Sequence, residues 1–399
     1  MTMTGQGVFD RKSALAFVLA FGVVSLFADA AYEGMRGVTG PFLALLGASG
    51  AVVGIVAGGG ELIGYLLRLG SGRLAGKSGA YWPLAITGYV IQMAAVPALA
   101  LAGSWQVAAL LIVLERAGKA IRNPAANFML SRAGNKIGQG WAFGLHEAMD
   151  QTGACAGPLI AALVLSHHGE YRTAFLWLGI PAALTILSVL ATRLRFPYAG
   201  HVARHEDAGE ARRALPRAFW IYALAAALIG FGFADYPLIA FHFARTGTVS
   251  TEWIPIFYAL AMGASGLGSL LFGRWFDTRG LVVLVPAILF GAAIAPLVFL
   301  GGFWAALVGA LFWGLSLGVH DAVMNAAIAG FVPENLRAHA FGLFSAVYGI
   351  AWFAGSALLG LLYDHSLMTL ILVASMAELA ALIPLAVALK KLTPSGLRT

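Results

Sequence analysis

Long apolar runs separated by short polar breaks extend along almost the whole chain. Runs of about 20 apolar residues are long enough to cross a bilayer as a helix. Reading these runs against charged residues and Gly/Pro breaks predicts twelve membrane helices. We expect them at residues 13–35, 41–69, 81–102, 105–130, 140–165, 172–194, 217–243, 252–275, 280–301, 303–330, 338–362 and 367–390. The pattern therefore predicts an all-α membrane protein.

One long polar stretch, residues 195–216, divides the predicted helices into two sets of six. It is rich in charged side chains and lacks an apolar face, which is typical of a solvated linker. We therefore predict an N-terminal six-helix half at 1–194, a cytoplasmic linker at 195–216 and a C-terminal six-helix half at 217–399.

The two predicted halves share short motifs at an almost constant offset. Phe-Ala-Asp at 27–29 recurs at 233–235, and Gly-Arg at 72–73 recurs at 273–274. Ala-Phe-Gly-Leu at 142–145 recurs at 340–343. Three matches in the same order indicate an internal repeat. Six spans per half give both copies the same orientation, so we predict two parallel six-helix repeats around a central cavity.

Composition and charge support a membrane setting. The chain is 60% hydrophobic and only 11% charged, which excludes an ordinary soluble domain. In the twelve-span arrangement, 22 of the 25 Lys and Arg residues flank one side, which predicts a multi-pass protein of the cytoplasmic (inner) membrane with both termini cytoplasmic. The net charge of +7 thus follows topology and does not indicate a nucleic acid partner. The single Cys155 excludes an internal disulfide.

Ionisable residues within the predicted spans are the strongest functional signal, because a charge in the bilayer is costly and usually faces a cavity or a partner. In the first helix, Asp29, Glu33 and Arg36 share one face. Glu33 and Arg36 are spaced for a local ion pair, which leaves Asp29 without a local partner and a candidate for proton exchange. Asp235 is the repeat copy of Asp29. The alternative for both acids is a purely structural hydrogen bond.

Other polar residues extend this candidate site. His146 and Asp150 lie one turn apart on the fifth helix, where they suit proton transfer, a divalent metal or a lock between helices. Glu115 and Arg116 are adjacent on the fourth helix and point about 100° apart, so we expect no direct pairing between them and a contact of each with another helix. The further candidates for substrate binding are Tyr32 and Tyr236 beside the repeated acids, and His320, Asp321 and Asn325 toward the cytoplasmic end of the tenth helix. We expect Glu61 and Arg68, which lie near the cytoplasmic end of the second helix, to be structural, and Glu378 as well.

The parallel repeat with a cytoplasmic linker resembles the major facilitator superfamily over essentially the whole chain. The segment 273–280 resembles the glycine, acid and arginine signature of that family, in which the acid and arginines clamp neighbouring helices. The residues that match it are Gly273, Arg274, Asp277, Arg279 and Gly280. The first-half copy at 72–79 departs from the signature, because Gly76 stands where the acid is expected.

Two weaker matches point to the proton-coupled exporters of the family. Gly153, Gly157 and Pro158 resemble their glycine–proline motif on the fifth helix, although Ala161 and Ala162 replace its trailing glycines. The alternative is that these small residues only let helices five and eight pack closely. Arg116 partly resembles an arginine that the family links to proton coupling.

These observations predict a proton-coupled secondary active transporter that works by alternating access and exports a small organic cation or zwitterion. The proton-coupling residues would be Asp29, Glu33, Asp150, Asp235 and Arg116. The chain has no Gly-x-x-x-x-Gly-Lys-Ser/Thr phosphate loop, so we expect no ATP site, no cofactor and no enzymatic activity. The expected partners are a small-molecule substrate, protons and the lipid bilayer, and the expected state is a monomer.

Several alternatives stay open. An organic anion would be held by Arg36, Arg116 or Arg245. A divalent transition metal would be exported if Asp29, His146, Asp150, His320 and Asp321 supplied its oxygen and nitrogen ligands. The non-transport alternatives are a membrane sensor or scaffold and a membrane-embedded enzyme.

Overall fold

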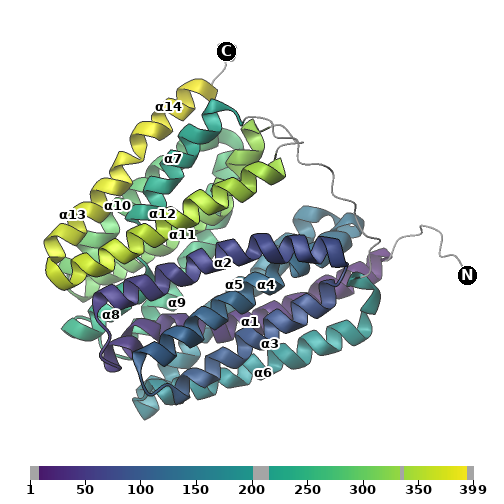
Figure 1. The fold of residues 1–399 in the computed structure, drawn as a ribbon, viewed down its shortest axis with the longest axis horizontal. Coiled ribbons are helices and arrows are strands. Elements are labelled where there is room, and N and C mark those ends of the chain that lie inside the picture. The colour runs from purple at the N-terminus through teal and green to yellow at the C-terminus, as the bar shows by residue number, and fades with distance from the viewer. Residues whose placement is uncertain (1–8, 201–214, 333–336, 393–399) are drawn as a thin grey trace, which may run out of the picture. The chain divides into compact units, whose positions relative to one another are not determined.

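The computed structural model describes residues 9–200, 215–332 and 337–392, and all the regular elements in these residues are helices (Figure 1). Most of the predicted linker lies outside the described residues, as do the side chains of Asp321 and Asn325. The helices of the first part are α1 (Arg11–Leu45), α2 (Gly50–Ser78), α3 (Tyr81–Ala98), η1 (Leu99–Leu101), α4 (Trp105–Ile137), α5 (Gln139–His168), α6 (Tyr171–Arg195) and η2 (Pro197–Gly200).

The second part repeats this helical organisation. Its elements are α7 (Arg217–Gly232), α8 (Tyr236–Thr246), α9 (Trp253–Arg279), η3 (Gly280–Val283), α10 (Leu284–Leu300), α11 (Phe303–Phe331), α12 (Arg337–His365), α13 (Leu367–Ala380) and α14 (Leu382–Leu392). The interrupted pairs α7/α8 and α13/α14 each correspond to one predicted span, which gives twelve spans in the described part of the chain. The all-α, twelve-helix expectation is therefore confirmed.

Hydropathy alone finds fewer spans than the structure does. Ten segments of the described residues are long and apolar enough to cross a membrane, and one of them, 253–300, contains both α9 and α10. Helix α4 is not among the ten, because it carries several charged residues near its middle. These buried charges are the first sign of a functional interior.

The helices form two compact units, with one border inside the predicted linker and residues 36–65 grouped with the C-terminal helices. The N-terminal unit comprises 1–35 and 66–208, and the C-terminal unit comprises 36–65 and 209–399. Within the first, α3 packs against α4 and α6, and α5 packs against α4 and α6. Within the second, α9 and α10 pack against α11, and α7 packs against α12, α13 and α14. Helices α1 and α2 contribute residues to both units.

Helix α1 is longer than predicted, and its extension belongs to the C-terminal unit. Gly37, Gly40 and Pro41 suggested a break, yet the helix continues through them to Leu45. The glycines serve close packing instead, because a Cβ at Gly40 would overlap the carbonyl oxygen of Pro237. At the start of α1, the Asp10 carboxylate accepts a hydrogen bond from the amide of Ser13 at 2.8 Å. Hydrogen bonds from Ser13 hold the pKa of the Asp10 carboxyl below its ordinary value.

Helix α2 begins nine residues later than predicted, at Gly50, and a side chain of α12 caps it. Asp364 accepts hydrogen bonds from the amides of Gly50 and Ala51 at 2.9 and 2.8 Å. Amides at a helix start lack partners within their own helix, so a carboxylate there satisfies them and favourably meets the helix dipole. The later start also moves Glu61 to about 16 Å from the beginning of the helix, near mid-span and not near its end as predicted.

The predicted seventh helix is interrupted at 233–235, between α7 and α8. Pro237 explains the break, because a proline inside a helix lacks an amide donor and clashes with the carbonyl four residues earlier. The interruption presents Asp235 at the start of α8 with extended backbone angles. The equivalent position two residues beyond Asp29 is Ala31, and α1 runs through this region without a break.

Candidate functional site

Close contact between α1 and α5 brings Asp29 of the first helix near His146 and Asp150 of the fifth. A Cβ at Gly153 would overlap the carbonyl oxygen of Leu26, and a Cβ at Gly157 would overlap that of Ala30. Only glycine allows these backbones to approach so closely. The sequence predicted close packing of helices five and eight. In the N-terminal unit these glycines pack α5 against α1, next to Asp29.

Helix α4 adds a polar face to the same unit. Glu115, Arg116 and Arg122 are buried, and Lys119 is half-buried between them. Arg116 lies about 16 Å and Arg122 about 25 Å from the start of the helix, so these cations are inside the span. The sequence analysis had counted these three basic residues among those flanking the membrane. That count was inconsistent with the predicted span 105–130, and in the structure all three lie in the interior of a helix that runs from Trp105 to Ile137.

Arg122 connects α4 to α3 and α1. Its Nε donates a hydrogen bond to Oε1 of Gln92 at 2.6 Å, and its Nη1 donates to the hydroxyl of Tyr89 at 3.1 Å. Its Nη2 lies 3.8 Å from Oδ1 of Asp29. The expectation that Asp29 lacks a cation therefore holds only within α1, because its partner comes from another helix. Gln92 extends the network by donating to Glu115 at 2.8 Å.

Two cations meet the aromatic ring of Tyr32. Arg116 donates a short hydrogen bond to the Tyr32 hydroxyl, and Nζ of Lys119 lies 3.9 Å from the centre of the ring. Such contacts are favourable because the face of an aromatic ring is negative. Arg116 also pairs with Glu115, with 3.7 Å between Nε and Oε2. The prediction that these neighbours do not pair directly was wrong, since both side chains extend to the same place.

His146 and Asp150 lie together on α5, as their spacing predicted. Nε2 of His146 is 3.8 Å from Oδ2 of Asp150 and 3.5 Å from the hydroxyl of Ser25 on α1. Asp150 also lies close enough to Asp29 for the two carboxylates to repel each other. The cluster therefore contains two carboxyl groups from facing helices in one buried place.

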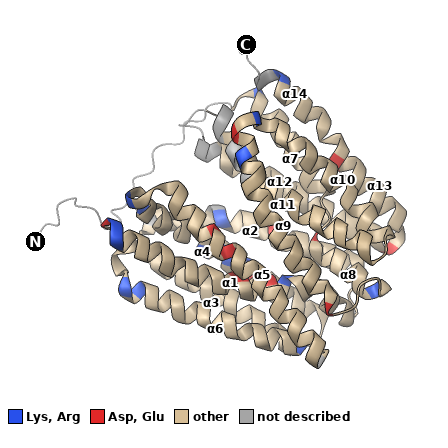
Figure 2. Cartoon of the chain, turned by 180° about the vertical axis from the view of Figure 1, so that it is seen from behind, with Lys and Arg blue, Asp and Glu red and all other residues tan. Residues whose placement is uncertain are grey.

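We call this set the N-terminal charge cluster. Its members come from α1, α3, α4 and α5, and are Asp29, Tyr32, Gln92, Glu115, Arg116, Lys119, Arg122, His146 and Asp150. Figure 2 shows red and blue segments where α1, α4 and α5 run through the N-terminal unit. Four buried polar atoms of the cluster have no hydrogen-bond partner among the described residues: Asp29 Oδ1, Glu115 Oε2, His146 Nδ1 and Asp150 Oδ1. Unsatisfied buried atoms of this kind are positions at which a proton or a solute can bind.

Asp235 forms a separate cluster in the C-terminal unit, which we call the Asp235 cluster. The carboxylate is 2% exposed, accepts a hydrogen bond from Nε1 of Trp352 at 2.9 Å, and accepts a short one from Ser356. Both donors are on α12. Asp235 thus has the satisfied hydrogen bonds that the structural alternative required, whereas Asp29, its repeat copy, does not.

The other predicted binding residues of the C-terminal unit are buried by packing. Tyr236 is fully buried, and its hydroxyl donates to the carbonyl of Ile254 at 2.7 Å. His320 packs against the ring of Phe233, with its Nδ1 3.5 Å from the hydroxyl of Tyr348. The side chains of its predicted companions, Asp321 and Asn325, lie outside what the structure describes.

Arg36 forms an ion pair with Glu61 on α2, with 3.4 Å between Nη2 and Oε1. This contact lies within the C-terminal unit, and the sequence did not predict it. The local ion pair of Arg36 with Glu33 stays a prediction, and an ion pair with Arg36 is compatible with the structural role expected for Glu61. Glu33 itself is buried on α1.

The segment that resembles the family signature ends α9. Arg274, Asp277 and Arg279 are exposed, and Gly280 stops the helix with a positive φ of 58°. No group of three or more His, Cys, Asp or Glu side chains in the described residues has the arrangement of a metal site. The predicted metal ligands are in fact divided, because His146 and Asp150 belong to one unit and His320 to the other.

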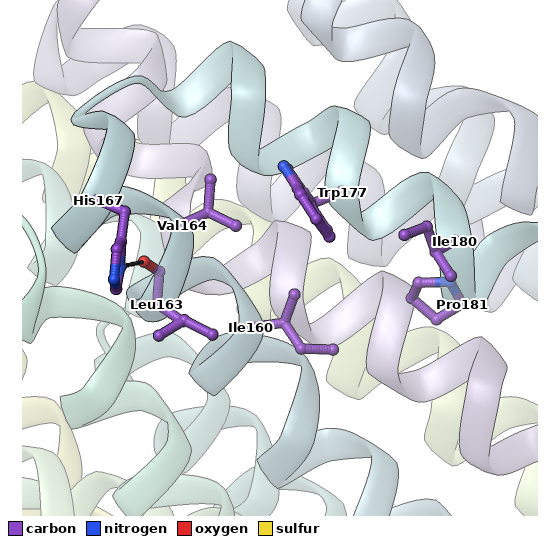
Figure 3. A pocket seen from close by; sticks show the side chains of 7 residues that line it. All are labelled: Ile160, Leu163, Val164, His167, Trp177, Ile180 and Pro181. Atoms are coloured by element: carbon purple, nitrogen blue, oxygen red, sulfur yellow. Dashed lines mark hydrogen bonds between the residues drawn. The ribbon is translucent and has the colours of Figure 1, made fainter.

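One well-formed cavity lies away from these charges, between α5 and α6 (Figure 3). Its volume is about 640 Å³, and it is lined by Ile160, Leu163, Val164, His167, Trp177, Ile180 and Pro181. The lining is apolar apart from His167, which hydrogen-bonds to the Leu163 carbonyl of its own helix at 2.9 Å. His167 is thus the one polar side chain among the residues that line this cavity, which suits an apolar occupant better than a charged solute.

Sequence reasoning found the acids of the N-terminal charge cluster but missed several of their partners. Lys119 and Arg122 follow Glu115 and Arg116 at the spacing of one helix face, which was a usable signal. Gln92 is a polar residue within an apolar run and could also have been noticed. Trp352 and Ser356 had no local signal, because their contact with Asp235 spans more than a hundred residues.

Comparison with known proteins now identifies the class. A profile of the Major Facilitator Superfamily matches residues 14–356, and the chain belongs to that family. It is therefore a multi-pass membrane transporter, and the fold is that of a secondary transporter acting by alternating access.

Relatives and solved structures agree with this assignment. Uncharacterized proteins of Mycobacterium tuberculosis and Mycobacterium bovis are 38% identical over 390 residues, covering 96% of this chain and 95% of theirs. Among solved structures, a mutant of the nucleoside transporter NupG is similar with a TM-score of 0.76 at 15% identity, covering 93% of this chain and 99% of that one. The peptide transporter POT gives 0.75 at 14% identity, covering 96% and 99%. An inward-facing bacterial homologue of the human lysosomal transporter Spinster gives 0.68 at 16%, covering 95% and 96%.

Proposed function

We propose that the chain is a proton-coupled transporter that exports a small zwitterionic organic solute, with the N-terminal charge cluster as its principal coupling and binding site. The observation that carries this proposal is the pair of buried carboxyl groups, Asp29 and Asp150, on helices in close contact, each with one buried oxygen that accepts no hydrogen bond among the described residues.

Two buried carboxyl groups that repel each other favour the binding of a proton by one of them, because charging both is costly. Arg122 lies 3.8 Å from Asp29, but its nearest hydrogen bonds go to Gln92 and Tyr89. Its charge is therefore only partly available to the acids. Binding or loss of one proton changes the charge of Asp29 and therefore its attraction to Arg122. This attraction is part of the contact between α1 and α4.

The mixture of charges supports a zwitterion in preference to a simple cation. Arg116 and Lys119 together face Tyr32, which makes a place for a carboxylate or another anionic group. Asp29 and Asp150 supply acids for an ammonium group in the same unit. A solute that carries both charges would pair with both sets without leaving a buried charge unmatched.

The direction and orientation of transport are part of the same proposal. Export is supported by the resemblance of Gly153, Gly157 and Pro158 to the exporter motif. Cytoplasmic termini are supported by the basic residues that flank the spans. Arg36, Arg116, Lys119 and Arg122 lie inside helices and are left out of this count. Of the 25 Lys and Arg residues, 19 then lie on the predicted cytoplasmic side, and only Arg172 and Arg245 lie on the other. We retain the inner membrane, the monomer and the other predicted coupling residues as proposals.

An organic anion is the second candidate, because Arg116 and Lys119 converge on one aromatic ring. It differs from the first in leaving Asp29 and Asp150 for protons alone. Such a solute would enter the cluster together with protons, whereas a zwitterion would exchange with them.

The two candidates are separated by solute-driven proton movement in proteoliposomes that contain the purified protein and an internal pH-sensitive dye. We expect zwitterions to alter the internal pH more than size-matched cations or anions, and in the direction of exchange. A response to anions alone, with proton movement in the same direction as the solute, would replace the first candidate with the second. The absence of any proton movement during measured solute flux would contradict proton coupling itself.

A further inference from the structure

Glu378 is a carboxylic acid in an unusual place. It lies on α13, about 16 Å from the start of that helix and near the middle of the α13/α14 span. The side chain is 1% exposed, and both carboxyl oxygens are buried without a hydrogen-bond partner among the described residues. It is the one acid of the described residues in which both oxygens are buried in this way.

Two glycines make the room that the side chain occupies. A Cβ on Gly291 of α10 would lie 2.7 Å from both Cδ and Oε1 of Glu378. A Cβ on Gly232 of α7 would lie 3.0 Å from its Cγ. The Glu378 side chain therefore passes Gly232, the last residue of α7, and its carboxyl group lies against the backbone of α10 at Gly291. Any larger residue at these two positions would displace it.

No counter-charge lies against this carboxyl in the described part of the C-terminal unit. Helix α10 carries no titratable residue. The titratable side chains described on the other elements packed against α13 are Arg217 and Tyr222 on α7, Tyr348, Tyr363, Asp364 and His365 on α12, and Lys390 on α14. Tyr222 donates its hydroxyl to the carbonyl of Met324, and Asp364 caps α2. Along the chain, Arg217 is more than ten residues from Gly232 of α7, and Lys390 is more than ten residues from Glu378 itself.

An ionised carboxylate is strongly disfavoured in this place. Burial of an unpaired charge is far more costly than burial of a neutral carboxylic acid. The neighbouring end of α7 adds to the cost, because the C-terminal end of a helix carries a partial negative charge. A metal ion would neutralise the acid but needs several oxygen ligands, and the neighbours on α7 and α10 are glycines.

We propose that Glu378 is a proton-binding site of the C-terminal unit, occupied by a proton in the conformation described here. Its position next to Gly232, at the end of α7, couples this proton to the break that presents Asp235. Separation of α13 from α7 and α10 would admit water, allow the acid to ionise and release the proton. This inference does not rest on proton-driven transport, because protonation of Glu378 can be measured directly.

Infrared difference spectroscopy of the purified, reconstituted protein tests the proposal. At neutral pH the wild type is expected to show a C=O absorption of protonated carboxyl groups, and Glu378→Gln is expected to lose the component that belongs to Glu378 while any component from Asp29 or Asp150 remains. Glu170→Gln makes the same chemical change at an exposed acid and is expected to retain the absorption. An identical spectrum for the wild type and folded Glu378→Gln would overturn the proposal.

A second variant keeps the test decisive if Gln prevents folding. Glu378→Asp retains a carboxyl group, and labelling with carboxyl-¹³C glutamate distinguishes the two residue types. We expect the absorption assigned to Glu378 to shift with the label in the wild type and to be replaced by an unshifted aspartate absorption in Glu378→Asp. An absorption that shifts equally in both proteins belongs to another glutamate and would contradict the assignment.

Discussion

Arg122 joins α4 to both α1 and α3. It reaches Gln92, Tyr89 and Asp29 from one guanidinium group, which suits its planar set of five donors. Lysine offers one compact charge and cannot make the same three contacts at once. The geometry of the N-terminal charge cluster therefore depends on this residue more than on any single acid.

We predict that Arg122→Gln lowers the free energy of unfolding by about 3 kcal/mol, because removing one partner leaves a buried charge uncompensated. The double variant Asp29→Asn/Arg122→Gln is expected to lose less than the sum of the two single variants. Thermal and denaturant unfolding of the detergent-solubilised protein measures all three. Arg193→Gln makes the same change at an exposed site and is the control. Strict additivity would show that Arg122 and Asp29 do not interact.

At the residue scale, sequence reasoning located acids better than their partners. Asp29 and Asp150 were identifiable because an acid in an apolar run is conspicuous. Lys119 and Arg122 were passed over because they were counted with the basic residues that flank the membrane, although they lie within the predicted helix 105–130. Glu378 was recognised as intramembrane but was assigned a structural role, since its isolation in space has no counterpart in the local sequence.

At the scale of elements, glycines on α5 decide how closely it approaches α1. Gly157 faces the carbonyl of Ala30, whereas Gly144 on the same helix has open space where its Cβ would be. We predict that Gly157→Ala is destabilising by about 1–3 kcal/mol, as is usual when an atom is inserted into a packed interior. Gly144→Ala is expected to be neutral or slightly stabilising, because alanine favours helix.

The measurement is thermal unfolding of both variants, together with binding or flux of the identified solute. Gly157→Ala is expected to reduce both, because a wider separation of α1 and α5 moves Asp29 away from Asp150. Equal melting temperatures for the two variants would contradict the role of Gly157 in this contact.

Helix breaks illustrate why local signals are not sufficient. The first helix was predicted to end at residue 35, yet α1 continues through Gly37, Gly40 and Pro41, and Gly40 allows close packing with α8. Pro237 has the opposite outcome and interrupts the seventh span before α8. The same residue types thus end one helix and are tolerated in another, depending on what packs beside them. The twelve-span pattern was predictable, because apolar length requires no tertiary information.

At the scale of the whole molecule, the predicted orientation is testable by labelling. After Cys155 is replaced by serine, single cysteines at Gly103 and at Val202 are expected to react from opposite sides of the membrane. Gly103 lies between η1 and α4, and Val202 belongs to the predicted linker. A membrane-impermeant thiol reagent applied to intact cells should label Gly103→Cys only. Labelling of Val202→Cys from outside would reverse the orientation, and labelling of both would contradict the twelve-span arrangement.

The two compact units differ from the two sequence repeats in one segment, residues 36–65. The sequence repeat divides the chain at the linker, but residues 36–65 pack with the C-terminal helices, through contacts such as the Asp364 cap of α2. The repeat records the similarity of the two halves along the chain, whereas packing depends on which surfaces meet in one conformation. The sequence similarity of the two halves therefore could not reveal that residues 36–65 pack with the C-terminal unit.

The central claim is that protons drive transport through the N-terminal charge cluster, and Asp29→Asn tests it most directly. Asparagine keeps the shape of the side chain but cannot titrate. In proteoliposomes with an imposed proton gradient, we expect the wild type and the Glu170→Gln control to accumulate solute against its gradient. Asp29→Asn should lose this accumulation while retaining solute counterflow, which needs binding and movement but no net proton transfer. Accumulation by Asp29→Asn with unchanged pH dependence would contradict the claim and make Asp29 a structural residue.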